Sequence, residues 1–181
     1  KKRTENLNNI TMRQGKSFGS IAFTDAVKAL QEKAGSRASY ARMEKNSYVD
    51  GLTENEMAFI AGRDSFYMAS IGANDFPYIQ HRGGPVGFLK VLDKNRISCV
   101  DFKGNMQFIS LGNFATNNNV ALIMVDYPTR TRLKILAKVE EVENATPKHE
   151  RMLIFYIEAY DWNCPQYITP RYTLAEIEAA L

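Results

Sequence analysis

The chain has 181 residues, of which 45% are hydrophobic and 24% charged, which is the size and composition of one ordinary globular domain. The formal net charge is +3; residues 1–16 carry five cationic side chains and one anionic one, so the remaining residues sum to 3 − 4 = −1. A body so close to neutrality argues against nucleic-acid binding, and no stretch approaches the roughly 18 consecutive apolar residues of a membrane span.

Residues 1–20 are predicted to form a basic N-terminal tail, followed by a single domain over residues 21–181. The tail lacks the apolar core and cleavage site of a secretory signal. Cys99 and Cys164 lie far apart, and the chain has only two His and no CxxC motif, so we expect reduced thiols and no metal site. These features predict a cytoplasmic protein with no membrane partner.

The N-terminal part is predicted to be helical. Apolar residues recur at helical spacing over residues 21–34, where Gly35 ends the helix, and Ser36 is placed to cap a second helix through about Asn46. Thr53 and Glu56 have the spacing of a capping box, which predicts a helix to about Arg63.

The remainder alternates short apolar runs with turn residues, which predicts about seven strands. Residues 96–102 alternate, as a strand with one apolar and one polar environment does, while the nearly continuous apolar run 120–127 predicts a fully buried strand. Short connections favour antiparallel pairing in a barrel or sandwich. The predicted strands cover residues 66–71, 78–80, 87–92, 96–102, 120–127, 133–142 and 152–160, with helices at 107–115 and, behind a Thr173–Glu176 capping box, 174–181.

The common catalytic motifs are absent from the sequence. It contains no phosphate-binding loop, no dinucleotide-binding glycine motif and no nucleophile turn, and neither His81 nor His149 has a nearby Cys or Ser. The sequence therefore does not predict a hydrolase triad.

Two short stretches could bind an anion. Gln80, His81 and Arg82 precede Gly83-Gly84, whose backbone N–H groups could turn towards a phosphate. Residues 103–105, Lys-Gly-Asn, precede a helix expected to open at about Met106, where unpaired N–H groups favour negative charge. Each stretch also has a simpler explanation, a structural turn or a solvated basic residue.

Arg132 follows a predicted turn and has two interpretations. The simpler one is a surface ion pair with Asp126, worth roughly 0 to 1 kcal/mol. The other is a bidentate contact with a ligand carbonyl or phosphate.

Several blocks together resemble one known family. The segments PYIQHRGGPVGFLKVLD, DFKGNMQFISLGNF and DYPTRTRLKI, with AVKALQEKAGSRASYARME upstream and EAYDWNCPQYITPR downstream, resemble the pyridoxamine 5'-phosphate oxidase-like family of FMN-binding split-barrel proteins. The resemblance covers roughly residues 22–181.

This resemblance implies an antiparallel split β-barrel with a helical N-terminal arm. It also implies a homodimer that binds FMN in two clefts at the subunit interface, where a small-molecule substrate reacts. By position it nominates eleven cofactor-binding residues: Gln80, His81, Arg82, Asp101, Asn105, Met106, Gln107, Asn113, Arg132, Trp162 and Arg171. Trp162, the single tryptophan, has two interpretations, a place over the flavin ring or packing in the core.

Two departures from the family pattern affect the expected chemistry. Close relatives read GNRQYIS where this chain reads GNMQFIS, so Met106 replaces an arginine. Losing a charge-assisted contact of about 1.5 to 3 kcal/mol would weaken FMN binding by about ten- to a hundred-fold unless Arg82 or Lys103 compensates. CPQYITPR lacks the Arg-Leu-His type signature of authentic pyridoxamine phosphate oxidases, so vitamin B6 oxidation is not predicted.

Three hypotheses follow from these patterns. The first is an FMN-dependent oxidoreductase, in which the cofactor performs the chemistry and no dedicated catalytic base is required. The second is a binding protein that holds flavin or haem in the same cleft without turnover, with His81 as the haem contact. The third is a dimeric barrel whose cleft takes no cofactor, which Met106 favours.

Overall fold

The computed structural model describes residues 16–46, 50–102, 106–142 and 151–181. The chain divides into two compact units, Lys1–Asp50 and Gly51–Leu181. No helix among the described residues is both long and apolar enough to cross a membrane.

The first unit contains three helices, α1 (Phe18–Ala22), α2 (Asp25–Lys33) and α3 (Arg37–Asn46). The predicted single helix over residues 21–34 is wrong, because Thr24 is extended and its hydroxyl accepts a hydrogen bond from the Val27 N–H, which starts a new helix. Gly35 has a φ of 71° and ends α2 as expected. The predicted tail boundary at residue 20 falls inside α1.

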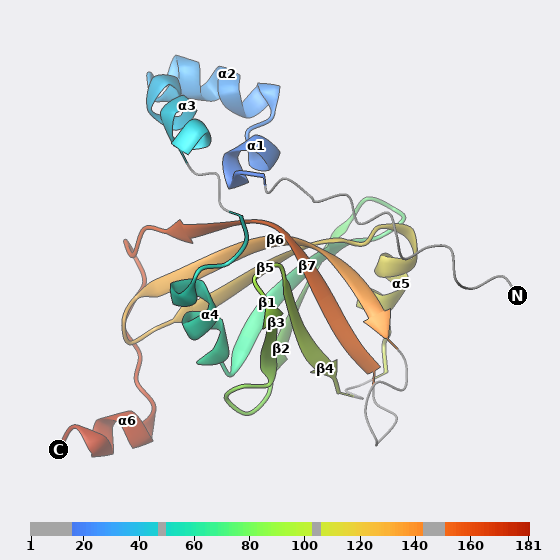
Figure 1. The fold of residues 1–181 in the computed structure, drawn as a ribbon, viewed down its shortest axis with the longest axis vertical. Coiled ribbons are helices and arrows are strands. Elements are labelled where there is room, and N and C mark those ends of the chain that lie inside the picture. Colours follow the sequence, from blue (N-terminus) through green and yellow to red (C-terminus); the bar gives the residue numbers. More distant parts are fainter. Residues whose placement is uncertain (1–15, 47–49, 103–105, 143–150) are drawn as a thin grey trace, which may run out of the picture. The chain divides into compact units, whose positions relative to one another are not determined.

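The second unit is built on one sheet of seven antiparallel strands, in the order β2-β1-β5-β6-β7-β4-β3 (Figure 1). The predicted antiparallel β architecture and strand number are confirmed. The strands are β1 (Ser65–Ile71), β2 (Pro77–Gly83), β3 (Leu89–Asp93), β4 (Arg96–Asp101), β5 (Asn119–Asp126), β6 (Thr131–Val142) and β7 (Arg151–Asn163).

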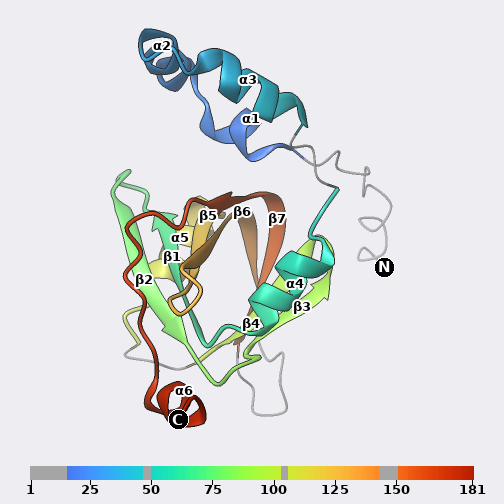
Figure 2. The ribbon, with the colours of Figure 1, turned by 90° about the vertical axis from the view of Figure 1, so that its left-hand side faces the viewer.

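Three helices accompany the sheet: α4 (Glu54–Ala61), α5 (Ile109–Thr116) and α6 (Leu174–Ala179). Both predicted capping boxes are present, at Thr53–Glu56 and Thr173–Glu176. α4 packs beside β3, and α5 packs beside β1 and β6 (Figure 2). α5 begins at Ile109, two residues later than predicted, because Phe108 adopts a left-handed conformation.

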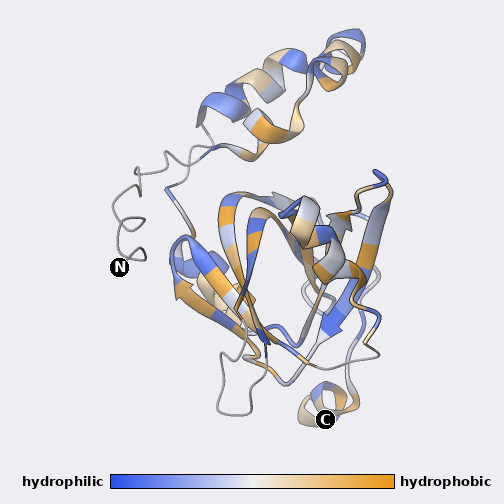
Figure 3. Cartoon of the chain, turned by 90° about the vertical axis from the view of Figure 1, so that its right-hand side faces the viewer, coloured by the Kyte–Doolittle hydropathy of each residue, from blue (hydrophilic) through white to orange (hydrophobic). Residues whose placement is uncertain are grey.

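The core is formed by the buried residues that alternate along the strands, most regularly in β5 and β6. Hydrophobic and hydrophilic residues follow one another along the strands (Figure 3). β5 is not buried on both faces as predicted: Val120, Leu122 and Met124 are buried, whereas the residues between them are only partly covered. In β4, by contrast, Ser98 is as buried as its neighbours. Fully buried side chains include Phe66, Phe155, Ile60, Met68, Leu89, Ile97, Leu122, Met124, Leu133, Ile135, Leu153 and Cys99.

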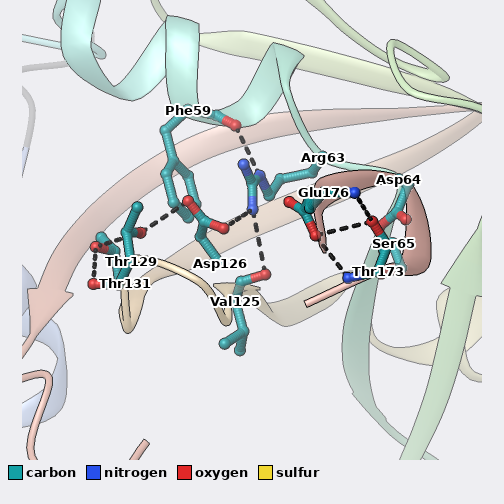
Figure 4. Close-up of polar contacts among 10 residues, drawn as sticks. All are labelled: Phe59, Arg63, Asp64, Ser65, Val125, Asp126, Thr129, Thr131, Thr173 and Glu176. Carbon is teal, nitrogen blue, oxygen red and sulfur yellow. Dashed lines mark hydrogen bonds and ion pairs between the residues drawn. The ribbon is translucent and has the colours of Figure 1, made fainter. Parts of the chain in front are cut away.

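Arg63 fastens the end of α4 to the sheet (Figure 4). Its Nε donates to the Phe59 carbonyl at 3.2 Å, while Nη1 lies 3.4 Å from the Val125 carbonyl and 3.1 Å from Asp126 Oδ1. Asp126 also accepts a hydrogen bond from the Thr129 hydroxyl. The ion pair expected between Asp126 and Arg132 is therefore wrong, since Arg63 takes that place.

Candidate functional site

A cleft of about 280 Å³ lies where β2, the end of β4, the start of β7 and the first turn of α5 come together. We call it the α5 cleft. Its lining combines aromatic, amide, hydroxyl and charged side chains, as small-molecule sites do. The residues are Tyr78, Gln80, Arg82, Asp101, Phe102, Met106, Gln107, Phe108, Ile109, Ser110, Leu111 and Arg151.

Strand β2 contributes alternate residues to the cleft. Gln80 and Arg82 line it, whereas His81 points to the other face, is exposed, and stacks edge-on against Tyr67 at 5.3 Å. This separation follows from the period of two along a strand. Three consecutive residues predicted as one anion site are thereby divided between two faces of the sheet.

Gly83 and Gly84 have structural roles at the end of β2. Gly83 is the last residue of β2 and pairs with Ser65, and the Gly84 N–H donates to the Asp64 carbonyl at 2.8 Å. A Cβ on Gly84 would lie 2.8 Å from Phe88 Cγ. The glycine is required for this close approach.

Asp101 joins two arginines at the cleft wall. Its Oδ1 lies 2.5 Å from Arg82 Nη1 and its Oδ2 lies 3.2 Å from Arg151 Nε. Only 9% of the Asp101 side chain and 11% of the Arg82 side chain are exposed, so the charges are held where water screens them weakly. The Nε atom of Arg82 is buried and has no hydrogen-bond partner among the described residues.

Gln80 extends this network to helix α5. Its Oε1 accepts hydrogen bonds from Arg82 Nη2 at 3.2 Å and from the Ser110 hydroxyl at 2.9 Å. Ser110 is buried in the first turn of α5. Gln80 therefore fixes that turn against β2.

The chain enters α5 through two residues with positive φ, Met106 at 59° and Phe108 at 54°. Residues other than glycine are uncommon at positive φ. Holding such a residue there costs roughly 1 to 3 kcal/mol, and residues held in this way are concentrated at functional sites. Phe108 provides no side-chain cap. The first turn of α5 lines the cleft with Ile109, Ser110 and Leu111, and the unpaired N–H groups of a helix start favour an anion.

Five of the eleven nominated residues line the α5 cleft: Gln80, Arg82, Asp101, Met106 and Gln107. Asn105 lies outside the described residues. Asn113 faces β1, where its Nδ2 donates to the Ser70 hydroxyl at 2.9 Å. Arg132 lies on β6 with a buried Nε that has no partner among the described residues. The nomination of Asn113 and Arg132 as flavin contacts stays a prediction.

Trp162 and Arg171 also lie outside the lining of the α5 cleft. Trp162 packs edge-on against Phe59 at 4.9 Å and donates from Nε1 to Glu56, and the Arg171 guanidinium lies 5.0 Å from the centre of the Tyr127 ring. Within one chain these contacts are structural. The predicted contact of either residue with a flavin stays a prediction.

A second cavity, of about 310 Å³, adjoins the first and shares Phe102 with it. It is mostly apolar and includes buried Cys99, where burial raises the pKa of the thiol to about 12. A thiol with this pKa stays protonated at neutral pH and is a poor nucleophile. The lining comprises Pro85, Val86, Gly87, Phe88, Lys90, Ser98, Cys99, Val100, Phe102 and Met152.

Arg151 is the functional candidate that sequence patterns missed. It is separated from Asp101 by fifty positions, and no motif marks it. The two residues are direct cross-strand partners in the β4–β7 pair. Only knowledge of that pairing and its register could have brought them together.

The fold has counterparts among solved structures. A candidate pyridoxamine 5'-phosphate oxidase from Lactobacillus delbrueckii aligns with a TM-score of 0.50 and 21% identity over 62% of this chain and 95% of its own. HupZ from Group A Streptococcus aligns with a TM-score of 0.50 and 12% identity over 67% of this chain and all of its own. The chain has their split β-barrel fold. No protein-family model and no curated protein sequence matches it.

Proposed function

We propose that this protein binds FMN in the α5 cleft and is an oxidoreductase that transfers hydride or electrons between the flavin and a small substrate. The observation that carries the proposal is the meeting of Arg151, the Arg82–Asp101 pair and the uncapped first turn of α5 at one cleft. Arginine forks and free helix N–H groups are the donors that phosphates favour. The split-barrel fold and the sequence blocks of FMN-binding proteins support the same ligand.

The described residues fit the parts of FMN. The phosphate would be held at the wall that contains Arg151 and the first turn of α5. The side-chain amides of Gln80 and Gln107 suit the ribityl hydroxyls and the flavin edge. Tyr78 and Phe102 offer aromatic surface on the same wall. Bound FMN would supply the redox chemistry, and the chain would orient it and exclude water.

A homodimer is part of the proposal. The cleft volume of about 280 Å³ lies at the lower limit of small-molecule sites, so a second subunit would complete it. The outward residues of β5, Ala121, Ile123 and Val125, are apolar, and Ile79 on β2 is 64% exposed. A sheet face that stays in water is normally polar, and a second copy would cover this one.

The absorption spectrum and FMN titration of purified protein test the binding proposal. We expect a flavin spectrum, or a rise in melting temperature on adding FMN to colourless protein. Protein that is colourless and unaffected by FMN overturns the proposal. A haem spectrum would instead support the haem-binding alternative.

Anaerobic mixing with NADH or NADPH tests turnover. An oxidoreductase that accepts electrons from these donors loses its flavin absorbance, whereas a protein that only binds flavin keeps it. Light-scattering mass measurement tests the homodimer, which a monomer at micromolar concentration would contradict.

A further inference from the structure

We infer that Arg151 binds the ligand phosphate in the α5 cleft and sets a preference for phosphorylated over unphosphorylated flavin. This inference rests on the proposed function, because FMN supplies the phosphate. It assigns the anion-binding role to the first residue of β7 rather than to Arg82, the arginine at the end of β2.

Arg82 is largely committed to partners in its own chain. Nη1 contacts Asp101 and Nη2 contacts Gln80, while Nε is buried without a partner among the described residues. Its side chain is 11% exposed. Arg82 therefore organises the wall of the cleft and has little donor surface left for a ligand.

Arg151 has the opposite arrangement. Its Nε lies 3.2 Å from Asp101 Oδ2 and 3.5 Å from Glu141 Oε1, whereas the described residues provide no partner for either terminal nitrogen. The guanidinium lies 5.1 Å from the centre of the Phe108 ring. Nε of the fork is thus held by carboxylates, and among the described residues the two terminal nitrogens stay open for bidentate recognition of phosphate.

The surroundings favour a single anion at this place. The charged residues of the cleft lining are Arg82, Arg151 and Asp101, two positive charges and one negative, while Glu141 contacts Arg151 from outside the lining. Phe108, whose ring makes the cation–π contact with the Arg151 guanidinium, is also the N-cap residue of α5. Arg151 and the first turn of α5 therefore lie at the same part of the cleft.

Titrating FMN and riboflavin into Arg151→Gln and the unaltered protein tests this role. We expect Arg151→Gln to weaken FMN binding by about ten- to a hundred-fold, the range of a charge-assisted phosphate contact, and to leave riboflavin affinity unchanged. The FMN affinity of Arg151→Lys should lie between those of Arg151→Gln and the unaltered protein. Equal affinity of Arg151→Gln and the unaltered protein for FMN, or equal losses for FMN and riboflavin, overturns the inference.

Two further variants separate a local contact from general charge or misfolding. Arg96→Gln removes one positive charge from the exposed pair with Asp93, outside the cleft, and should leave FMN affinity unchanged. Met106→Arg places a cation in the same lining and should restore FMN binding in the Arg151→Gln protein. Failure of this rescue in a variant that unfolds as cooperatively as the unaltered protein counts against a shared phosphate site.

Inorganic phosphate distinguishes failure of this inference from failure of the proposed function. If the unaltered protein does not bind FMN, melting temperatures with phosphate and with chloride at equal ionic strength are compared. Stabilisation by phosphate that Arg151→Gln abolishes supports the anion site while removing FMN as its ligand. No effect of phosphate on the unaltered protein overturns both.

Discussion

Trp162 Nε1 donates a hydrogen bond of 2.6 Å to Glu56 Oε1, which joins strand β7 to the first turn of α4. Glu56 is 4% exposed, and its other oxygen accepts from the Thr53 N–H at 2.8 Å and from the Tyr160 hydroxyl at 3.1 Å. One carboxylate therefore caps a helix and holds that helix on the sheet.

Glu56→Gln should lower the free energy of unfolding by about 1 to 3 kcal/mol, because an amide nitrogen would face donors that now meet a carboxylate. Urea unfolding followed by the fluorescence of Trp162, the single tryptophan, measures the loss. Glu54→Gln, an exposed neighbour in the same turn, is the control and should cost much less. Equal losses of unfolding free energy in the two variants would contradict this role of Glu56.

The same residue predicts acid sensitivity. Burial raises the pKa of Glu56, but hydrogen bonds from Thr53, Trp162 and Tyr160 outweigh it and leave the pKa below its usual 4.5. A lowered folded pKa contributes stability that is present above about pH 4.5 and lost as pH falls through the folded value. Unfolding free energies measured below pH 4.5 should therefore fall less steeply in Glu56→Gln than in the unaltered protein.

Arg82→Met should destabilise the protein by about 3 kcal/mol, because it leaves the buried Asp101 carboxylate with Arg151 alone. The double change Arg82→Met with Asp101→Asn should cost clearly less than the sum of the single changes, since the two residues share one contact. Chemical denaturation of the four proteins gives the coupling. Additive costs would show that the pair is not coupled.

The two cysteines should differ in reactivity. Cys164 is exposed, whereas Cys99 is buried with its pKa raised to about 12. A thiol reagent at neutral pH should therefore label one cysteine in the folded chain and two after denaturation. In Cys164→Ser, rapid labelling without denaturant would contradict the burial of Cys99.

Gly84 and Gly112 form a matched pair of positions. Gly84→Ala would bring Cβ to 2.8 Å from Phe88 Cγ and should cost about 1 to 3 kcal/mol through overpacking. Gly112 in α5 has nothing within 4 Å of the added Cβ, so Gly112→Ala should stabilise the protein by about 0.5 to 1 kcal/mol. Thermal unfolding measures both changes in stability. A gain in both variants, or a loss in both, would contradict the different surroundings of the two glycines.

Local sequence signals predicted most of the secondary structure. Short apolar runs bounded by turn residues identified the strands, and the Thr53–Glu56 and Thr173–Glu176 boxes identified the starts of α4 and α6. Errors occurred where a single residue outweighed a pattern. Thr24 divides one apparent helix into two, and Phe108 delays the start of α5 through its positive φ.

The sequence by itself determined the antiparallel β architecture, and its multi-block resemblance implied the split barrel and nominated Gln80, Arg82, Asp101, Met106 and Gln107, which line one cleft. Apolar runs, turn residues and family blocks are properties of short segments. Only the tertiary structure brought His81 against Tyr67 and Arg151 across from Asp101. It also revealed that Trp162 packs on α4. These contacts depend on which strands pair and in what register, which is a property of the whole folded sheet.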